Sequence, residues 1–308
     1  MSDLVAPRDR RLGETWTRTQ TWKNDALYAL AMVALGATGR LGARWRRRLG
    51  RLVGDVVWLG WPAGRALVAR NLAVALPGSS VSARAVLRGL GETLADTVGL
   101  ARGEAPGLVL RDDDARVLES AVAEGRGVVY ATAHLGSWEA MGPLLAARGL
   151  AVATVARESY DARFDRVYSR LREAHGVRAL YRGAPGFATA LVRALRAGTV
   201  VGFPMDFAGR GVRAVPAAWF GVPLPTPVGP AEVALRTGAA VVVATPTRDP
   251  GGPETLSIER VATEGHDAGT LTSELARRLS RRIEAMPTAW PWMARDLAAG
   301  LPLALRSR

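Results

Sequence analysis

Four short apolar runs rich in β-branched residues alternate with longer amphipathic segments from about Val117 onward. The runs occupy residues 127–134, 151–156, 199–206 and 239–248. Short runs of this kind, bounded by Gly or charged positions, are typical of buried strands. The intervening segments at 161–176 and 184–198 are long enough for crossover helices. The pattern predicts an α/β fold with a mainly parallel central sheet flanked by helices.

An ionisable residue stands at the end of three of these runs. His134 ends the first run, Arg157 follows the second and Asp206 ends the third. In open parallel sheets, ligands and chemistry collect at the carboxyl ends of the strands. If the three strands are neighbours, we expect these side chains to converge at one edge of the sheet.

The string HLGSWE places Glu139 five residues after His134. On one continuous helix the two side chains would diverge by about 140°. If His134 stays at the strand end and a helix begins near Ser137, the Glu139 carboxylate can instead fold back against the imidazole. Such a carboxylate fixes the tautomer, so that the other ring nitrogen can take a proton from a hydroxyl group. The spacing alone is equally compatible with a buried histidine and a surface glutamate.

The first quarter of the chain combines apolar runs with arginines. Residues 26–39 are uncharged, but this run is shorter than the roughly twenty residues that a helix needs to cross a bilayer. Six arginines lie between Arg40 and Arg51, and five of the nine tryptophans occur by Trp61, which suits an interface with anionic lipid. We expect residues 15–65 to form helices that lie on, or dip into, a membrane surface. Ordinary amphipathic helices packed on the core and an arm that binds nucleic acid are the alternatives.

The charge of the chain predicts an anionic partner. The net charge is +13, and the first 70 residues contribute +8 of it, from thirteen Lys or Arg and five acidic residues. Nucleic acid, lipid head groups and an acidic carrier protein would all suit such a charge. The absence of cysteine and the wide separation of His134, His175 and His266 argue against a metal site.

Motifs of other common enzyme classes are missing from the sequence. It contains no G-x-S-x-G string, which the nucleophile elbow of an α/β hydrolase requires. Lys23 is the only lysine, which excludes the Gly-Lys-Ser or Gly-Lys-Thr of a P-loop. GATGRLG at 36–42 follows a helix-like run instead of a strand, so we do not expect a dinucleotide-binding loop there.

Four strings carry a family resemblance. ATAHLGSWEAMG contains an H-x4-E motif, RNLAVALP lies at 70–77, a block with Phe-Gly and a threonine spans 219–248, and WPWMAR lies at 290–295. Together they resemble the signature segments of the bacterial lipid A biosynthesis acyltransferases, which are secondary lauroyl and myristoyl transferases, and of the relatives that acylate phosphatidylinositol mannosides. The similarity covers roughly residues 15–297. Ser137 and Phe207 stand where this family usually has Asn and Gln.

The resemblance implies a glycerolipid acyltransferase-like domain at 66–308, preceded by a basic, membrane-associating helical region at 1–65. It implies transfer of a fatty acyl chain from an acyl-carrier-protein or CoA thioester to a hydroxyl group of a lipid A precursor or similar glycolipid. The reaction would take place at the cytoplasmic face of the cell inner membrane, with no cofactor, metal or nucleic acid. A phosphatidylinositol mannoside or another phospholipid is the alternative acceptor, and a non-catalytic protein that binds membrane surfaces is the alternative function.

The resemblance also implies roles for individual residues. His134 is expected to be the general base and Glu139 its partner. Arg157 and Asp206 stand where the family has Arg and Asp, and they are expected to shape the head-group pocket. The other expected substrate-binding residues are Ser137 and Arg248.

Overall fold

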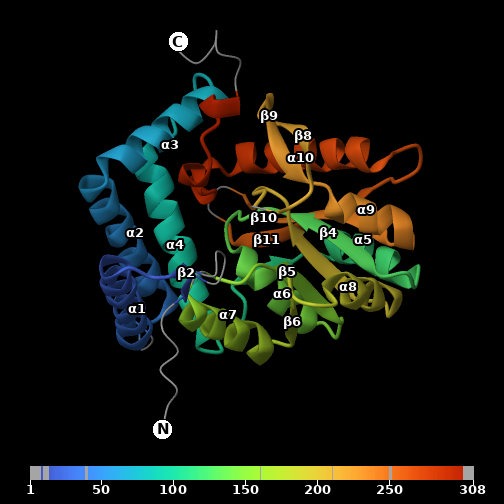
Figure 1. The fold of residues 1–308 in the computed structure, drawn as a ribbon, viewed down its shortest axis with the longest axis horizontal. Helices are drawn as coiled ribbons and strands as arrows, with labels where there is room; N and C mark the ends of the chain where they lie inside the picture. Colours follow the sequence, from blue (N-terminus) through green and yellow to red (C-terminus); the bar gives the residue numbers. More distant parts are fainter. Residues whose placement is uncertain are drawn as a thin grey trace.

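A seven-stranded sheet lies at the centre of the molecule, with helices on both faces and further helices from the N-terminal part along one side (Figure 1). This computed structural model describes residues 8–9, 14–38, 41–159, 161–209, 211–249 and 252–300. Arg40, which belongs to the predicted arginine cluster, lies outside these ranges.

The strands of the central sheet are β3 (Leu108–Leu110), β4 (Val128–Thr132), β5 (Val152–Ala156), β6 (Val177–Tyr181), β7 (Val200–Pro204), β10 (Ala240–Arg248) and β11 (Glu254–Val261). Their order is β3-β11-β10-β4-β7-β5-β6. The five strands from β10 to β6 are parallel to one another, whereas β11 is antiparallel to β10 and β3 runs parallel to β11. The prediction of a mainly parallel sheet is confirmed, and β4, β5, β7 and β10 lie within the four predicted runs.

Two sets of helices cover the two faces of the sheet. One face carries α5 (Asp112–Ala123), α6 (Trp138–Ala146) and α7 (Ala162–Ala174), and the other carries α8 (Phe187–Arg196), α9 (Gly229–Thr237) and α10 (Ala268–Ala285). Alternate residues of each central strand enter different cores. In β4, Val128 and Tyr130 pack with α5 to α7, whereas Val129 and Ala131 pack with α8 to α10. The strands are buried on both faces, which explains their nearly continuous apolar runs.

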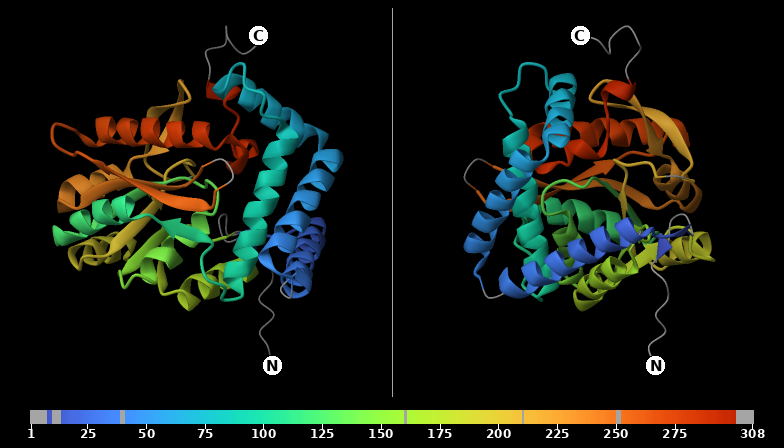
Figure 2. Two further views of the ribbon diagram at one scale, coloured as in Figure 1. Left: turned by 180° about the vertical axis from the view of Figure 1, so that it is seen from behind. Right: turned by 60° about the vertical axis from the view of Figure 1, so that its left-hand side comes forward.

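The N-terminal part forms α1 (Arg18–Thr38), α2 (Ala43–Gly60), α3 (Pro62–Ala75) and α4 (Ala83–Ala101). Helix α4 lies between α2 and the sheet domain (Figure 2). The predicted domain boundary at residue 65 falls inside α3, whose Val68 and Leu72 belong to the core of the sheet domain. In the described part of the chain, every helix is too short or too polar to cross a bilayer.

Glycines allow α2 and α4 to pack closely. A Cβ atom on Gly91 would overlap the backbone carbonyl of Gly50, and one on Gly50 would overlap that of Gly91. Gly54 meets the carbonyl of Leu87 in the same way. The backbones of the two helices therefore touch directly.

The remaining elements cover the carboxyl edge of the sheet and the outside of the molecule. The hairpin of β8 (Ala214–Trp219) and β9 (Val222–Pro227) packs against α10. The chain ends in the short 3-10 helices η1 (Pro287–Ala289), η2 (Trp292–Ala294) and η3 (Ala298–Gly300), and a two-stranded pair, β1 (Arg8–Asp9) and β2 (Glu14–Thr15), precedes α1.

Asn71 of α3 holds this C-terminal segment in place. Its side-chain amide donates to the carbonyls of Trp292 and Arg295, each at 2.6 Å, and its Oδ1 accepts the N–H of Leu297 at 3.0 Å. Asn71 is fully buried. The two motifs RNLAVALP and WPWMAR, which are more than 200 residues apart, therefore meet in space.

The contact between α2 and α4 gives a stability prediction. We expect Gly91→Ala to lower the free energy of unfolding by about 1–3 kcal/mol, because the added methyl group forces two helix backbones apart. The control is Gly60→Ala at the exposed end of α2, where a Cβ meets nothing within 4 Å. Urea denaturation of the two variants measures the difference. Equal losses in both would contradict the close packing of these helices.

Candidate active site

Two neighbouring strands bring His134 and Asp206 together at the carboxyl edge of the sheet. Strands β4 and β7 are parallel, and Thr132 at the end of β4 pairs with Pro204 at the end of β7. The N–H of Met205 also donates to the carbonyl of Thr132 at 2.9 Å, which continues the ladder beyond the strands. His134 and Asp206 each lie two residues beyond these ends, so the register places them side by side.

Asp206 is fully buried and accepts three hydrogen bonds. Its Oδ1 lies 2.9 Å from Nδ1 of the His134 ring, and its Oδ2 accepts the backbone N–H of His134 at 2.9 Å. The indole N–H of Trp290 donates to the same Oδ2 at 2.9 Å. Because an ionised carboxylate can only accept, Nδ1 of His134 carries a proton. In the neutral ring Nε2 then has a free lone pair, which is the form that a general base requires.

The two groups shift each other's pKa values. Burial would lower the pKa of His134, but the charge of Asp206 and its hydrogen bond to the ring outweigh burial and raise the pKa above 6.5. The charge of Glu139 adds to this increase, and that of Arg172 opposes it. Burial would likewise raise the pKa of Asp206, but the charge of His134 and the hydrogen bonds from His134 and Trp290 lower it overall. Asp206 therefore stays ionised and makes the imidazole more basic.

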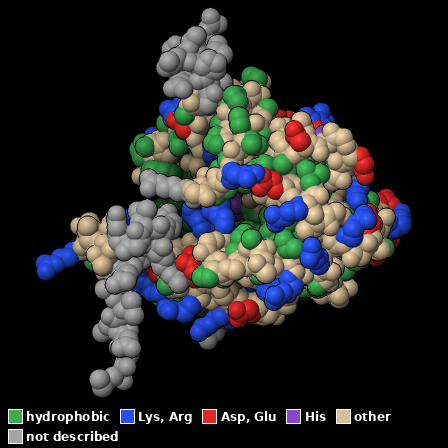
Figure 3. Space-filling view, turned by 45° about the vertical axis from the view of Figure 1, so that its right-hand side comes forward, with side chains coloured by type: hydrophobic (Ala, Val, Ile, Leu, Met, Phe, Trp, Pro, Cys, Tyr) green, Lys and Arg blue, Asp and Glu red, His purple; other side chains and the backbone are tan. Residues whose placement is uncertain are grey.

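His134 lines a cavity of about 480 Å³ at the ends of the strands. Its charged lining residues are Glu139, Arg157, Asp165, Arg172 and Arg182, and its apolar lining includes Met141, Pro143, Val155 and Val177. Figure 3 shows blue Lys and Arg side chains gathered near the middle of one face, beside a purple histidine. The cavity thus combines a cationic part with an apolar part, which suits an amphiphilic molecule with a polar head and an apolar chain.

Aromatic rings hold the imidazole in position. The His134 ring lies 5.4 Å from the Trp138 ring in an edge-to-face arrangement and 5.2 Å from the Phe207 ring. Phe207 in turn stacks on Trp290, with ring centroids 5.8 Å apart. Phe207 replaces the glutamine usual in the resembled family, and here it packs against the imidazole.

Glu139 lies in the same cavity, but its hydrogen-bond partner is not the imidazole that the resemblance implied. Helix α6 begins at Trp138 as expected, and Gly136 makes the preceding turn with a φ of 52°. The Glu139 carboxylate accepts hydrogen bonds from Arg172 of α7, at 2.7 Å from Nη2 and 3.3 Å from Nε. The expected contact of Glu139 with the imidazole is therefore wrong in the described structure, because Asp206 occupies that position on the ring.

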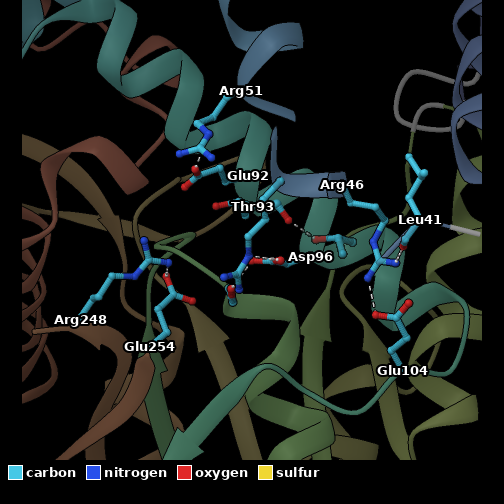
Figure 4. A network of polar contacts seen from close by, with 12 residues as sticks. Leu41, Arg46, Arg51, Glu92, Thr93, Asp96, Glu104, Arg248 and Glu254 are labelled. Atoms are coloured by element: carbon cyan, nitrogen blue, oxygen red, sulfur yellow. Dashed lines mark hydrogen bonds and ion pairs between the residues drawn. The ribbon is translucent and has the colours of Figure 1, made fainter. Parts of the chain in front are cut away.

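Ser137 and Arg248 lie away from this cavity. Ser137 Oγ donates to Oδ2 of Asp96 at 3.4 Å, and Asp96 also accepts from Nε of Arg47 at 2.7 Å. Nη2 of Arg248 lies 3.1 Å from Oε1 of Glu254. Figure 4 shows Asp96 of α4 and the pair of Arg248 and Glu254 in one network of polar contacts. Arg248, Glu254 and Asp96 line a second cavity of about 210 Å³.

The structure therefore separates the predicted site residues into two groups. His134, Glu139 and Arg157 line the larger cavity, and Asp206 lies behind the imidazole. Ser137 and Arg248 belong to the polar contacts beside α4. Within the described ranges, no cluster of three or more His, Asp or Glu side chains is arranged to hold a metal ion.

Sequence reasoning missed three residues of the site. Trp290 was visible as part of WPWMAR, but nothing in that string indicates a hydrogen bond to Asp206. Arg172 lies on α7, whose amphipathic pattern predicts a buried face without naming a partner for it. Arg182 follows a strand that the sequence did not predict. These three side chains are placed by tertiary contacts, which leave no local pattern.

The chain matches known proteins over most of its length. The family model of bacterial lipid A biosynthesis acyltransferases matches residues 16–298, which confirms the resemblance of the motifs. Two similar curated proteins are named phosphatidylinositol mannoside acyltransferase and come from Mycobacterium tuberculosis strains CDC 1551 / Oshkosh and ATCC 25618 / H37Rv. Each is 30% identical over 201 residues, which span 62% of this chain and 62% of the relative.

The pair of His134 and Asp206 gives a prediction that needs no activity assay. In Asp206→Asn the negative charge is lost while burial of the ring remains, so we expect the pKa of His134 to fall below its wild-type value. The measurement is an NMR titration of the histidine ring protons in both proteins. His175, whose Nε2 lies 2.9 Å from the Leu100 carbonyl, is the internal control, and its ring signals should be the same in both proteins. An unchanged pKa of His134 would show that Asp206 does not tune the imidazole.

Proposed function

Because this chain belongs to the bacterial lipid A biosynthesis acyltransferase family, we propose that it transfers a fatty acyl chain from a thioester donor to a hydroxyl group of a glycolipid. The observation that carries the proposal is the imidazole of His134, held by Asp206 with Nε2 free, in the wall of a cavity with a cationic and an apolar part. The donor is an acyl-carrier-protein or CoA thioester, and no metal or organic cofactor takes part.

His134 is the general base of the proposed reaction. Its Nε2 takes the proton of the acceptor hydroxyl while the hydroxyl oxygen attacks the thioester carbonyl carbon. The tetrahedral intermediate then collapses, the carbon–sulfur bond breaks, and the imidazolium returns the proton to the leaving thiolate. Asp206 stabilises the imidazolium through its charge and its hydrogen bond to Nδ1. The first turn of α6 lines the cavity, so its positive end is available for the developing oxyanion.

Glu139 is the second catalytic residue of the proposal, and it acts through charge. Its carboxylate raises the pKa of His134 without bonding to the ring, and Arg172 keeps it in place. The side chains of both partners are largely buried, at 11% and 15% exposure, so the interaction is little screened by water. Arg157 lines the same cavity and is the proposed head-group ligand.

The acceptor is a glycolipid with a free hydroxyl group. A lipid A precursor is the acceptor that the family description suggests, and a phosphatidylinositol mannoside is the one that the names of the two relatives suggest. Both are amphiphiles with phosphate-bearing head groups, so the cationic part of the cavity suits either. An assay with both acceptors is therefore part of the test below.

The proposed site of action is a membrane surface, at the cytoplasmic face of the inner membrane. Helix α2 exposes an apolar stripe at three- and four-residue spacing, formed by Trp45, Leu49, Leu52, Val53, Val56 and Leu59. Helix α1 adds exposed Trp22, Leu27, Leu30 and Val33. Arg48 lies 4.6 Å from the Trp45 ring, which places a cation beside the stripe. Exposed apolar side chains bordered by arginine are the features by which a helix lies in an anionic membrane interface.

Transfer assays with site variants test the proposed reaction. We expect the wild type to move a radiolabelled acyl chain from acyl-carrier-protein or CoA to one acceptor of a panel that includes lipid A precursors and phosphatidylinositol mannosides. His134→Ala should lower the rate by about 10²–10⁴-fold, because the general base is lost. Asp206→Asn and Glu139→Gln should each reduce it by less, since the base remains. The control is His266→Ala, in a loop outside the cavity, and it should keep the wild-type rate.

Two outcomes of this assay would contradict the proposal. Transfer that survives in His134→Ala would exclude the histidine as base. A wild type that binds donor and vesicles but transfers nothing to any acceptor would favour the alternative function, a basic protein that binds membrane surfaces without catalysis. Circular dichroism of each variant separates loss of chemistry from loss of folding.

Vesicle binding tests the membrane surface separately. We expect the protein to sediment with vesicles that contain anionic phospholipid, and Leu52→Ser with Val56→Ser to weaken binding by about 10-fold or more, because two exposed apolar side chains of α2 no longer enter the interface. Leu235→Ser is the matched control, since Leu235 is exposed on α9. Helices α9 and α2 lie on opposite sides of the molecule (Figure 1). Equal binding by the double variant and the control would exclude α2 as the contact.

A further inference from the structure

Two arginines converge at the cavity, and neither has a carboxylate partner among the residues that the structure describes. Arg157 follows β5 and Arg182 follows β6, and these neighbouring parallel strands pair Ala156 with Tyr181. The N–H of Arg182 also donates to the carbonyl of Ala156 at 2.8 Å, which fixes the two strand ends relative to each other. Each arginine directly follows the end of its strand, so the register of β5 and β6 places the two side by side. The register of β4 and β7 places His134 beside Asp206 in the same way.

Gly209 marks the point where the two guanidinium groups meet. A Cβ atom on Gly209 would lie 2.9 Å from Nη2 of Arg182 and 3.3 Å from Nη1 of Arg157. The two nitrogens are thus no farther apart than the sum of these distances. Both side chains line the cavity that contains His134.

Within the described ranges, neither of these two arginines forms an ion pair. Arg172 in the same cavity is bound by Glu139, whereas neither Arg157 nor Arg182 has a carboxylate partner in the described part of the chain. The pKa of Arg182 is lowered by burial and by the charge of Arg157, so the free protein bears a repulsion there. Asp165 also lines the cavity, and its Oδ1 accepts the N–H of Ser159 at 2.7 Å.

We propose that Arg157 and Arg182 form a binding site for a phosphate ester carried by a substrate of the acyl transfer. Guanidinium groups bind phosphate oxygens with paired N–H donors, and two of them a few ångströms apart can hold one phosphate between them. The negative charge of a bound phosphate also offsets the repulsion between the two arginines. Arg182 is a binding residue for the reaction, and the inference rests on the proposed function. The phosphate belongs either to the phosphopantetheine arm of the donor or to the head group of the acceptor lipid.

Binding of inorganic pyrophosphate to the full-length protein tests the site without turnover. By calorimetry we expect the wild type to bind pyrophosphate and Arg182→Gln to bind it about 10-fold or more weakly. Arg182→Lys should have an intermediate affinity, because lysine keeps the positive charge but lacks the paired N–H donors of the guanidinium group. The matched control is Arg178→Gln, because Arg178 is exposed on β6 and does not line the cavity. Equal binding by the wild type and Arg182→Gln would overturn the proposal.

Kinetics then identify which substrate carries the phosphate. If it is the donor, Arg182→Gln raises KM for acyl-phosphopantetheine about 10-fold and leaves KM for acyl-pantetheine unchanged. If it is the acceptor, only KM for the phosphorylated acceptor rises. Unchanged KM values for all of these would overturn the proposed site even if transfer is robust. The protein could also bind pyrophosphate through Arg182 and yet transfer no acyl chain. That result would support the anion site and contradict the proposed reaction.

Discussion

The hydrogen bonds to the Asp206 carboxylate join three parts of the chain, which are the ends of β4 and β7 and the C-terminal segment. A buried charge without partners costs several kcal/mol, so this carboxylate is stable only with its three donors in place. Two of them come from His134 on the neighbouring strand end, and the third is the indole of Trp290. The indole reaches it because Asn71 of α3 binds the C-terminal segment through three hydrogen bonds. The catalytic geometry proposed here therefore depends on the sheet, an N-terminal helix and the last described residues together.

The strands of the site were predictable from sequence, whereas the pairing of side chains was not. Strands β4, β5 and β7 are buried on both faces, so their apolar runs are visible in the sequence, and their ends carry His134, Arg157 and Asp206. The five-residue spacing left the pairing of Glu139 with His134 open, and the resemblance of the H-x4-E motif implied it. The actual partner is 72 residues away, and the contact requires β7 to lie next to β4. Hydrophobic periodicity carries no information about strand order.

The strands that sequence reasoning missed lie toward the edges of the sheet. β6 is an edge strand in which Val177 and Leu180 are buried, whereas Arg178 is exposed. Edge strands commonly carry charged side chains, which prevent pairing with other chains, so their apolar signal is weak. β11 also mixes polar with apolar positions. Arg182 could not be predicted for this reason, since its place in the cavity follows from a strand that the pattern does not reveal.

The indole contact to Asp206 has a consequence for biosynthesis. Protein chains leave the ribosome from the N-terminus, and both strands that carry His134 and Asp206 emerge well before Trp290. Until then the carboxylate lacks one of its donors, and Asn71 has no C-terminal segment to bind. A nascent chain therefore has its apolar α1 and α2 available before its imidazole is fully held. The helices of the proposed membrane surface are therefore synthesised before the segment that completes the proposed general base.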